Sequence, residues 1–422
     1  MIVPAPQVQL WVGMIKYTLD AKPEDSGPAL GSGVTSEGTQ RADWVFAVQP
    51  MAGVKNPTKV TADVTATFDS DVLYRYPPDR SSCRQRTEHV KGGKWVITSG
   101  LGVLTSDGSR PRALTMVATP AGLYSQNPKM TGTESDPCAG LAPYSWDGET
   151  DMPSLFFDVL VPPGESYIAG TSNYIPESQP VDGLRRYVRT NDLQWDTIGG
   201  DFHGFEYVLQ ASPCSSPLPT VNNRKSMAAA LSSSVNSVVN SSPRLQRAIN
   251  DLKGKYNPTY LTGAWPAGPN SNGYTSRESS GIRVALAWSK LSNRFDAAQV
   301  FAHELAHVSQ ILNRGFSPAE AAAVMTSAQY ANFRWAAEIE AFEFQANVLA
   351  EIDERAPWLR GCVEQIYNKD PILRPETTGD ELKADISERY GGDQYRDEWE
   401  RDHGTKVSKE TADKISEYLK TH

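Results

Sequence analysis

Two histidines four residues apart on a predicted apolar helix constrain this chain most. They are His303 and His307 in the segment VFAHELAHVSQ, and Glu304 lies between them. Residues four apart lie on one face of an α-helix, so both imidazole rings can close on one metal ion. Glu304 is one residue further round, near enough to reach a water molecule on that metal without binding the metal itself. The spacing therefore supplies two neutral nitrogen ligands and one carboxylate base.

The helix that carries this motif is apolar nearly all round, which predicts that it is buried. Its apolar residues are Phe295, Ala298, Val300, Phe301, Ala302, Leu305, Ala306, Val308, Ile311 and Leu312. Buried histidines beside a buried glutamate need polar partners, and a metal ion is one that satisfies them. We therefore expect a metal site here rather than a surface helix with three exposed polar side chains.

The third metal ligand is expected on a later helix. A motif with a third histidine would need glycine at 310 and histidine at 313, but the chain has Gln310 and Asn313. A glutamate on a following helix is the other common solution. The segment WAAEIEAFEFQANVLAEI is rich in helix-forming residues and offers Glu338, Glu340 and Glu343.

The helical neighbours of the three glutamates separate them. Glu340 shares its face with alanines and a phenylalanine, and the face of Glu343 is nearly as apolar. Glu338 shares a more polar face with Arg334 and Gln345. We therefore predict Glu340 as the third ligand, with Glu343 as the second choice. At least two of the three glutamates are expected to be solvated helix charges.

The run HELAHVSQ followed by EIEAFEFQ resembles the gluzincin type of zincin metallopeptidase, in particular small bacterial members whose ligand glutamate stands in an ExEA pattern. The resemblance extends over about residues Ile282 to Ile352 and does not reach the first 220 residues. It implies that His303, His307 and Glu340 bind Zn²⁺ and that Glu304 is the general base. The implied activity is hydrolysis of peptide bonds by a zinc-activated water, as in a gluzincin-like endopeptidase.

The segments around the motif predict the rest of a peptidase cleft. The run GIRVALAW (281–288) is β-rich and apolar and predicts the antiparallel edge strand on which an extended peptide could lie. Asn293 or Asp296 could cap the motif helix, and Gly315 is suited to end it. A new helix is expected at Ser317, which begins a capping box. Residues 261–281 are rich in Gly, Pro, Ser and Asn and predict a loop or flap.

A further hydrogen-bond donor is expected to stabilise the oxyanion during hydrolysis. The candidates in the sequence are Tyr274, Tyr330, Tyr390, Tyr395 and His403. His403 lies in the charged stretch ERDHGTK, where a solvated surface position is expected.

Residues 1–215 predict an all-β accessory domain, sandwich-like or barrel-like, from alternating segments separated by turn residues. The expected strands lie at 7–19, 43–49, 59–68, 94–104, 112–119, 154–161 and 205–211. Residues 216–243 predict a linker or part-helical connection, and 244–369 an α+β, mainly helical, zincin-like catalytic domain. Residues 370–422 predict a charged extension that ends in an amphipathic helix.

Composition limits the partners of the chain. It has 422 residues and a formal net charge of −9 without a basic cluster, so a nucleic-acid partner is not expected. Its apolar runs are too short to span a membrane. A protein or peptide substrate is expected, and the oligomeric state stays open.

Four cysteines are present, and none forms a CxxC pair that would indicate a cysteine zinc site. Two disulfides could pair in three ways, and we favour Cys83–Cys138 in the first half with Cys214–Cys362 between the halves. The alternative is four reduced thiols in a cytosolic protein. With the abundance of Ser, Thr, Gly, Asn, Tyr and Trp, the expected disulfides favour a secreted or periplasmic bacterial protein, although no leader pattern follows Met1.

Two other functions are compatible with the motif. One is a zinc amidase that acts on a non-protein amide such as peptidoglycan. The other is a β-rich binding protein whose zincin half is catalytically silent. The intact Glu304 counts against the second, because a degenerate copy would be expected to lose its base first.

Overall fold

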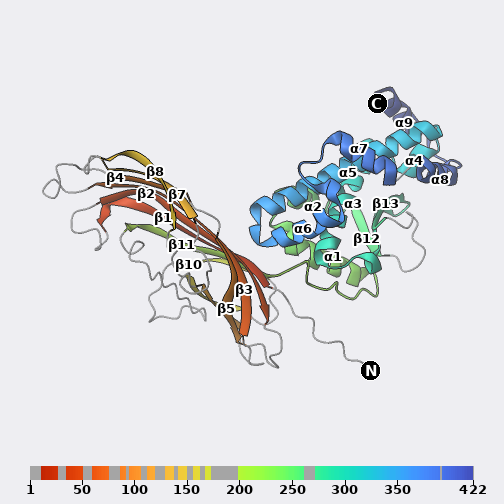
Figure 1. Ribbon diagram of the computed structural model, residues 1–422. Coiled ribbons are helices and arrows are strands. Elements are labelled where there is room, and N and C mark those ends of the chain that lie inside the picture. Colours follow the sequence, from red (N-terminus) through yellow and green to blue (C-terminus); the bar gives the residue numbers. More distant parts are fainter. Residues whose placement is uncertain are drawn as a thin grey trace. The chain divides into compact units, whose positions relative to one another are not determined.

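The computed structural model describes residues 11–26, 35–50, 59–75, 86–91, 95–105, 112–118, 129–136, 141–149, 155–161, 167–172, 198–260, 271–389 and 392–421. The chain divides into two compact units, Met1–Ser212 and Pro213–His422. Figure 1 shows strands in the first unit and mostly helices in the second. In the described part of the chain, no helix is both long and apolar enough to cross a membrane.

The described residues of the first unit form antiparallel strands. These are β1 (Trp11–Ser26), β2 (Thr35–Pro50), β3 (Lys59–Arg75), β4 (Arg86–Lys91), β5 (Trp95–Thr105), β6 (Arg112–Ala118), β7 (Lys129–Asp136), β8 (Leu141–Glu149), β9 (Leu155–Val161), β10 (Tyr167–Ser172) and β11 (Ile198–Ala211). The main path of the sheet runs β10-β11-β1-β2-β3-β4-β7-β8. The sheet branches at β3, because residues 69–74 of this strand pair with β4 and residues 59–66 with β5, which continues to β6 and β9.

All seven strand segments expected in this half overlap observed strands, and β2, β3 and β11 extend well beyond their predicted bounds. Four strands were not expected: β4, β7, β8 and β10. Segments such as KMTGTESD in β7 are polar and lack the alternation that marks a half-buried strand. A sandwich or barrel arrangement of this sheet stays a prediction.

The second unit begins with a three-stranded sheet. Its strands are β12 (Tyr256–Tyr260), β13 (Gly273–Glu278) and β14 (Gly281–Leu286), in the order β12-β14-β13. The predicted strand at 281–288 is therefore β14, but it is central and largely buried rather than at an edge. The strand that pairs with it antiparallel at the edge is β13, in a segment for which we expected a loop. Residues 261–270 of that expected loop lie outside the described residues.

Helices make up most of the second unit. They are α1 (Arg224–Val239), α2 (Pro243–Leu252), α3 (Arg294–Arg314), α4 (Pro318–Ala322), α5 (Ser327–Arg355), α6 (Arg360–Lys369), α7 (Gly379–Arg389), α8 (Gly392–Asp402) and α9 (Lys409–Thr421). The motif helix α3 packs against the sheet, α1 and α5. Its expected burial is confirmed for most apolar positions, with Leu312 left 36% exposed.

Local capping explains where α3 begins and ends. The Asn293 side chain accepts a hydrogen bond from the backbone N–H of Asp296 at 2.8 Å. At the other end Gly315 has φ 78°, the left-handed conformation that glycine adopts without steric cost. Ser317 then caps α4 with Glu320 in a reciprocal capping box. These caps are the ones that the sequence predicts.

The second unit extends at both ends beyond the domain that we expected at 244–369. Residues 216–243 are part-helical, one of the two forms expected, and their helix α1 buries Leu231 and Val235 and packs on α3 within the second unit. Residues 370–422 are not a separate extension. Ile415 of α9 is fully buried in an apolar cluster with Phe316 and Met325. The helices after residue 370 carry charges on their exposed faces and are apolar on one narrow stripe only. Their composition therefore understates how closely they pack.

Cys214 and Cys362 form the expected disulfide. Both cysteines belong to the second unit, so the bridge joins the start of this unit to α6 and does not tie the two halves together as we expected. Cys83 and Cys138 lie outside the described residues.

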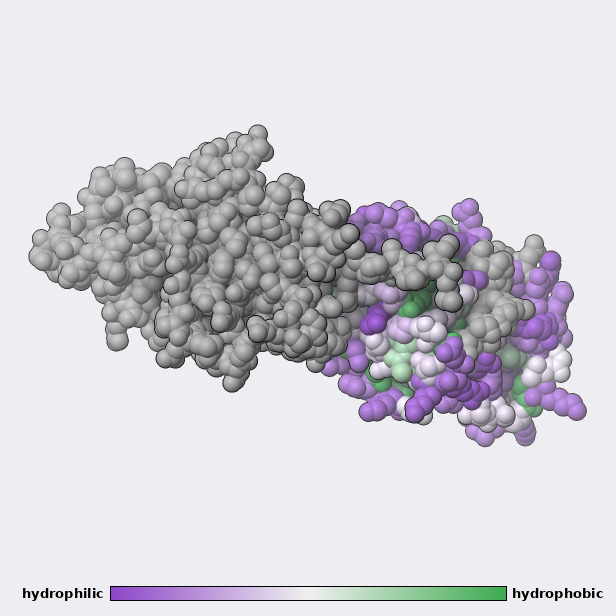
Figure 2. All heavy atoms as spheres, turned by 90° about the horizontal axis from the view of Figure 1, so that it is seen from below, coloured by the Kyte–Doolittle hydropathy of each residue, from purple (hydrophilic) through white to green (hydrophobic). Residues whose placement is uncertain are grey.

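One face of the second unit is mainly polar (Figure 2). On the face drawn in Figure 2, hydrophilic residues cover most of the coloured surface, and hydrophobic residues appear as small separate areas. Leu312 is the one large apolar side chain classed as exposed among the residues whose burial is described.

Candidate metal centre

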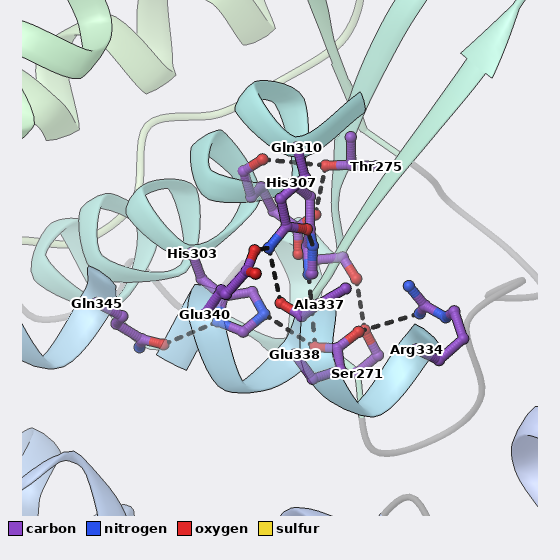
Figure 3. Close-up of polar contacts among 12 residues, drawn as sticks. Ser271, Thr275, His303, His307, Gln310, Arg334, Ala337, Glu338, Glu340 and Gln345 are labelled. Carbon is purple, nitrogen blue, oxygen red and sulfur yellow. Dashed lines mark hydrogen bonds and ion pairs between the residues drawn. The ribbon is translucent and has the colours of Figure 1, made fainter. Parts of the chain in front are cut away.

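The structure brings His303 and His307 of α3 together with Glu338 of α5 (Figure 3). Oε2 of Glu338 lies 3.3 Å from Nε2 of His303 and 3.4 Å from Nε2 of His307. The three ligand atoms lie within 4.8 Å of one another. The side chains are only 12%, 12% and 6% exposed, respectively. Two imidazole nitrogens and one carboxylate oxygen thus converge in a site that is largely closed to solvent.

Glu340, which we expected as the third ligand, does not join this group. Its side chain is 54% exposed and accepts hydrogen bonds from Gln310 at 2.8 Å and Arg314 at 3.1 Å. The second choice, Glu343, is exposed as well. The glutamate that lies with the two histidines is therefore Glu338, and our choice of Glu340 for that place is wrong.

The physical reason is a buried ion-pair network on the polar stripe of α5. Arg334 donates from Nη2 to Oε1 of Glu338 at 3.0 Å and from Nε to Oε2 of Glu398 at 3.1 Å. The hydroxyl of Tyr330 donates to the same Glu398 oxygen at 3.3 Å. A stripe that reads as solvent-facing is buried because its charges neutralise one another. The i,i+4 spacing of Arg334 and Glu338 is the one sequence signal for this arrangement.

The hydrogen bonds behind the two rings test whether a metal suits these residues. Nδ1 of His307 lies 2.9 Å from Oε1 of Gln310, and Nδ1 of His303 lies 3.1 Å from Oε1 of Gln345. Donation from both Nδ1 atoms leaves the Nε2 lone pairs facing the carboxylate of Glu338. Three electron-pair donors aimed at one another repel unless a proton or a metal cation lies among them. Zinc prefers this combination of imidazole and carboxylate, so the residues suit such an ion.

Electrostatics at the site favour positive charge beside its carboxylates. Burial acts to lower the pKa of His307, but the carboxylates of Glu338 and Glu304 outweigh it and raise that pKa. Burial acts to raise the pKa of Glu338, but His307, His303 and Arg334 hold it well below its usual range. The carboxylate is thus kept ionised by the positive charge around it.

Glu304 lies buried beside the three converging residues, with a side chain held by β13. It is 4% exposed, and its Oε2 accepts a hydrogen bond from the Thr275 hydroxyl at 2.6 Å. Its chain passes so close to Gly273 that a Cβ built on this glycine would lie 2.6 Å from Cδ of Glu304. Glycine at 273 and a hydroxyl at 275 therefore fix where this carboxylate lies.

Two hollows meet at the site. One, of about 410 Å³, is lined by β13, α3, α5 and α8, and the other, of about 430 Å³, by the start of α3 and by α5 and α6. Both are lined by Ser271, Gly273, His303 and Glu304. Glu304 and His303 therefore border both hollows.

The candidate oxyanion donors fall into different environments. Tyr274 lines the first hollow, and burial raises its pKa, so its hydroxyl stays protonated as a donor. Tyr330 also lines this hollow but donates to Glu398, and Tyr395 is buried. His403 is exposed, as expected. Tyr390 lies outside the described residues.

Comparisons of the chain with family models, curated proteins and solved structures give no match.

Proposed function

We propose that this chain is a zinc-dependent metallopeptidase in which His303, His307 and Glu338 bind the metal and Glu304 is the general base. The observation that carries the proposal is the convergence of three buried ligand atoms beside a separate buried carboxylate. A helix that carried these residues for packing alone would not need two Nε2 atoms facing one carboxylate oxygen.

Zinc bound at such a site supplies a Lewis acid that polarises a carbonyl group and lowers the pKa of a water molecule. The protein's own part begins with Glu304, which accepts a proton from water and passes it to the leaving amine. Thr275 holds the carboxylate of Glu304 in place, so the base does not need to reorganise. Arg334 orients Glu338 through the oxygen that does not face the histidines. Tyr274 lines one of the hollows that Glu304 also lines, and it is our candidate for the oxyanion donor.

The position of β13 supports a peptide as substrate. In the described sheet this strand pairs with β14 on one side only, so its other edge is open to pairing. Gly273 and Thr275 of β13 also contact Glu304, so a peptide added to this edge would lie beside the base. This makes a peptide bond a more suitable substrate than an isolated amide.

The Cys214–Cys362 disulfide supports a protein that works in an oxidising compartment, because such bonds persist outside the reducing cytosol. We therefore propose a secreted or periplasmic location.

The test is a cleavage profile of proteome-derived peptides exposed to the zinc-loaded full chain. Wild type should generate new amino termini, and Glu304→Gln should retain zinc but generate none. Glu343→Gln, an exposed glutamate on α5, is the matched control and should cleave like wild type. Equal cleavage by Glu304→Gln, or by protein stripped of metal, would sink the proposal.

A further inference from the structure

The hydrogen bonds of Gln310 determine which way its amide group faces. Its Nε2 lies 2.9 Å from the backbone oxygen of Ala337 and 2.8 Å from Oε2 of Glu340. A backbone carbonyl and a carboxylate only accept hydrogen bonds, so the amide NH₂ must face them. Gln310 and His307 both lie on α3, and the amide oxygen is thereby turned back toward His307 (Figure 3).

This orientation determines the tautomer of His307. The amide oxygen of Gln310 lies 2.9 Å from Nδ1 of the ring and can only accept. Nδ1 must therefore carry a hydrogen, and the lone pair of the neutral ring is left on Nε2. That is the nitrogen that faces Glu338 at 3.4 Å.

We propose that Glu340 and Gln310 form a positioning relay that holds His307 as the Nδ1–H tautomer, ready to bind a metal through Nε2. This inference rests on the proposed metal site and adds a role for two residues outside the ligand set. Arg314 holds the far end of the relay, because its Nη2 lies 3.1 Å from the same Glu340 oxygen. Helix α5 thus supplies one ligand, Glu338, and two residues later the carboxylate that prepares another.

The relay differs from the arrangement at the other histidine. Gln345 contacts Nδ1 of His303, but its amide nitrogen donates to the side chain of Gln299. An amide oxygen is a weaker constraint than a carboxylate, because a glutamine side chain can turn over and offer its nitrogen instead. We therefore expect the tautomer of His307 to be held more strictly than that of His303.

The test uses the full chain with ¹⁵N-labelled histidine, loaded with zinc, and reads two quantities that do not require turnover. One is the nitrogen of His307 that binds zinc, from its ¹⁵N shifts, and the other is zinc affinity, by competition with a chelator. Gln310→Met keeps an unbranched side chain but removes the acceptor. It should lower zinc affinity about 10-fold to 100-fold, the usual effect of losing a partner of a metal-binding histidine. The ¹⁵N shifts should show a mixture of nitrogens at zinc in place of Nε2 alone.

The rescue variant is the double substitution Gln310→Glu with Glu340→Gln, because the new carboxylate at 310 still accepts from Nδ1–H and faces an amide at 340 instead of a second carboxylate. It should keep zinc on Nε2 and bind it much more tightly than Gln310→Met. Glu340→Met should weaken binding by less than Gln310→Met, and Glu343→Met, on the same helix, should have no effect. Wild-type affinity in Gln310→Met, or a greater loss in the double variant than in Gln310→Met, overturns the relay.

The outcomes also separate the relay from the proposed function. Zinc held through Nε2 without peptide hydrolysis would remove the peptidase proposal and leave the relay intact. Peptide hydrolysis by wild type, together with a Gln310→Met chain that binds zinc as tightly as wild type and through Nε2, would remove the relay and leave the peptidase. A wild-type chain that takes up no zinc would overturn both.

Discussion

Arg334 donates to one carboxylate oxygen of Glu338 at 3.0 Å, while the other oxygen of Glu338 faces the two histidines of α3. One carboxylate oxygen of Glu338 thus holds the side chain in place, and the other remains available to a metal. Arg334 is held in place as well, because it also pairs with Glu398 of α8. The site therefore depends on a helix that lies far beyond its last ligand in the chain.

Removing Arg334 should lower the stability of the fold. Arg334→Met leaves the carboxylates of Glu338 and Glu398, which are 6% and 14% exposed, without their cation. We expect the free energy of unfolding of the metal-free chain to fall by about 3–5 kcal/mol, as for other buried pairs that lose one partner. Urea unfolding measures this.

The control for Arg334 is Arg360→Met. Arg360 pairs with Asp353 at 2.9 Å, but the two side chains are 53% and 37% exposed. Its loss should change the unfolding free energy by less than about 1 kcal/mol. Equal effects of the two substitutions would show that the Arg334 network is not a buried anchor.

Gly273→Ala should impair turnover without removing zinc. The added methyl group would lie 2.6 Å from Cδ and 2.7 Å from Cγ of Glu304, so the glutamate must move. A misplacement of about 1 Å can cost about 100-fold in rate, and we expect a loss of kcat of that order. Steady-state kinetics on a cleaved peptide, with zinc content measured in parallel, check this. Gly379→Ala, where a Cβ meets nothing within 4 Å, is the control and should leave kcat unchanged.

Glu351 should make the stability of the chain depend on pH. Burial acts to raise its pKa, but the backbone N–H of Arg244, the Ser242 hydroxyl and the Arg244 guanidinium outweigh it and lower that pKa. The folded pKa thus lies below the unfolded one. The stabilisation is present above the unfolded value and is lost as the pH falls through the folded value.

Glu351→Gln should therefore lower the free energy of unfolding by about 1–2 kcal/mol near neutral pH, the size of a hydrogen-bonded charge. The difference from wild type should begin to shrink as the pH falls to about 4, the ordinary pKa of a glutamate, and should continue to shrink as the pH falls through the lowered pKa of the folded state. Glu354→Gln, an exposed glutamate on the same helix, should show no such dependence. A difference between Glu351→Gln and wild type that stays constant with pH would contradict the assignment.

The sequence predicts the features whose causes are local. The start of α3 at Asn293, its end at Gly315 and the capping box at Ser317 each depend on residues within one turn. The pairing of His303 with His307 on one face follows from helical periodicity alone. These predictions needed no knowledge of what packs against the helix.

Features that depend on distant partners were missed. The edge strand β13, GYTSRE, has little apolar content and forms through its pairing with β14. Glu338 was ranked below Glu340 because a polar helical face usually points to solvent. Its burial depends on Glu398, on a much later helix, which neutralises Arg334. A single sequence does not reveal such a long-range charge pair.

The zinc content of three variants tests the central claim most directly. Glu338→Gln, Glu340→Gln and Glu343→Gln change neighbouring positions of one helix by the same single atom. In Glu338→Gln, the amide oxygen of the new side chain could still accept from Arg334 and preserve the fold. After loading with zinc and dialysis, metal analysis of the full chain should find zinc retained in the variants at 340 and 343 and lost in the variant at 338. Retention of zinc by Glu338→Gln, whatever the other two variants do, would contradict the site described by His303, His307 and Glu338.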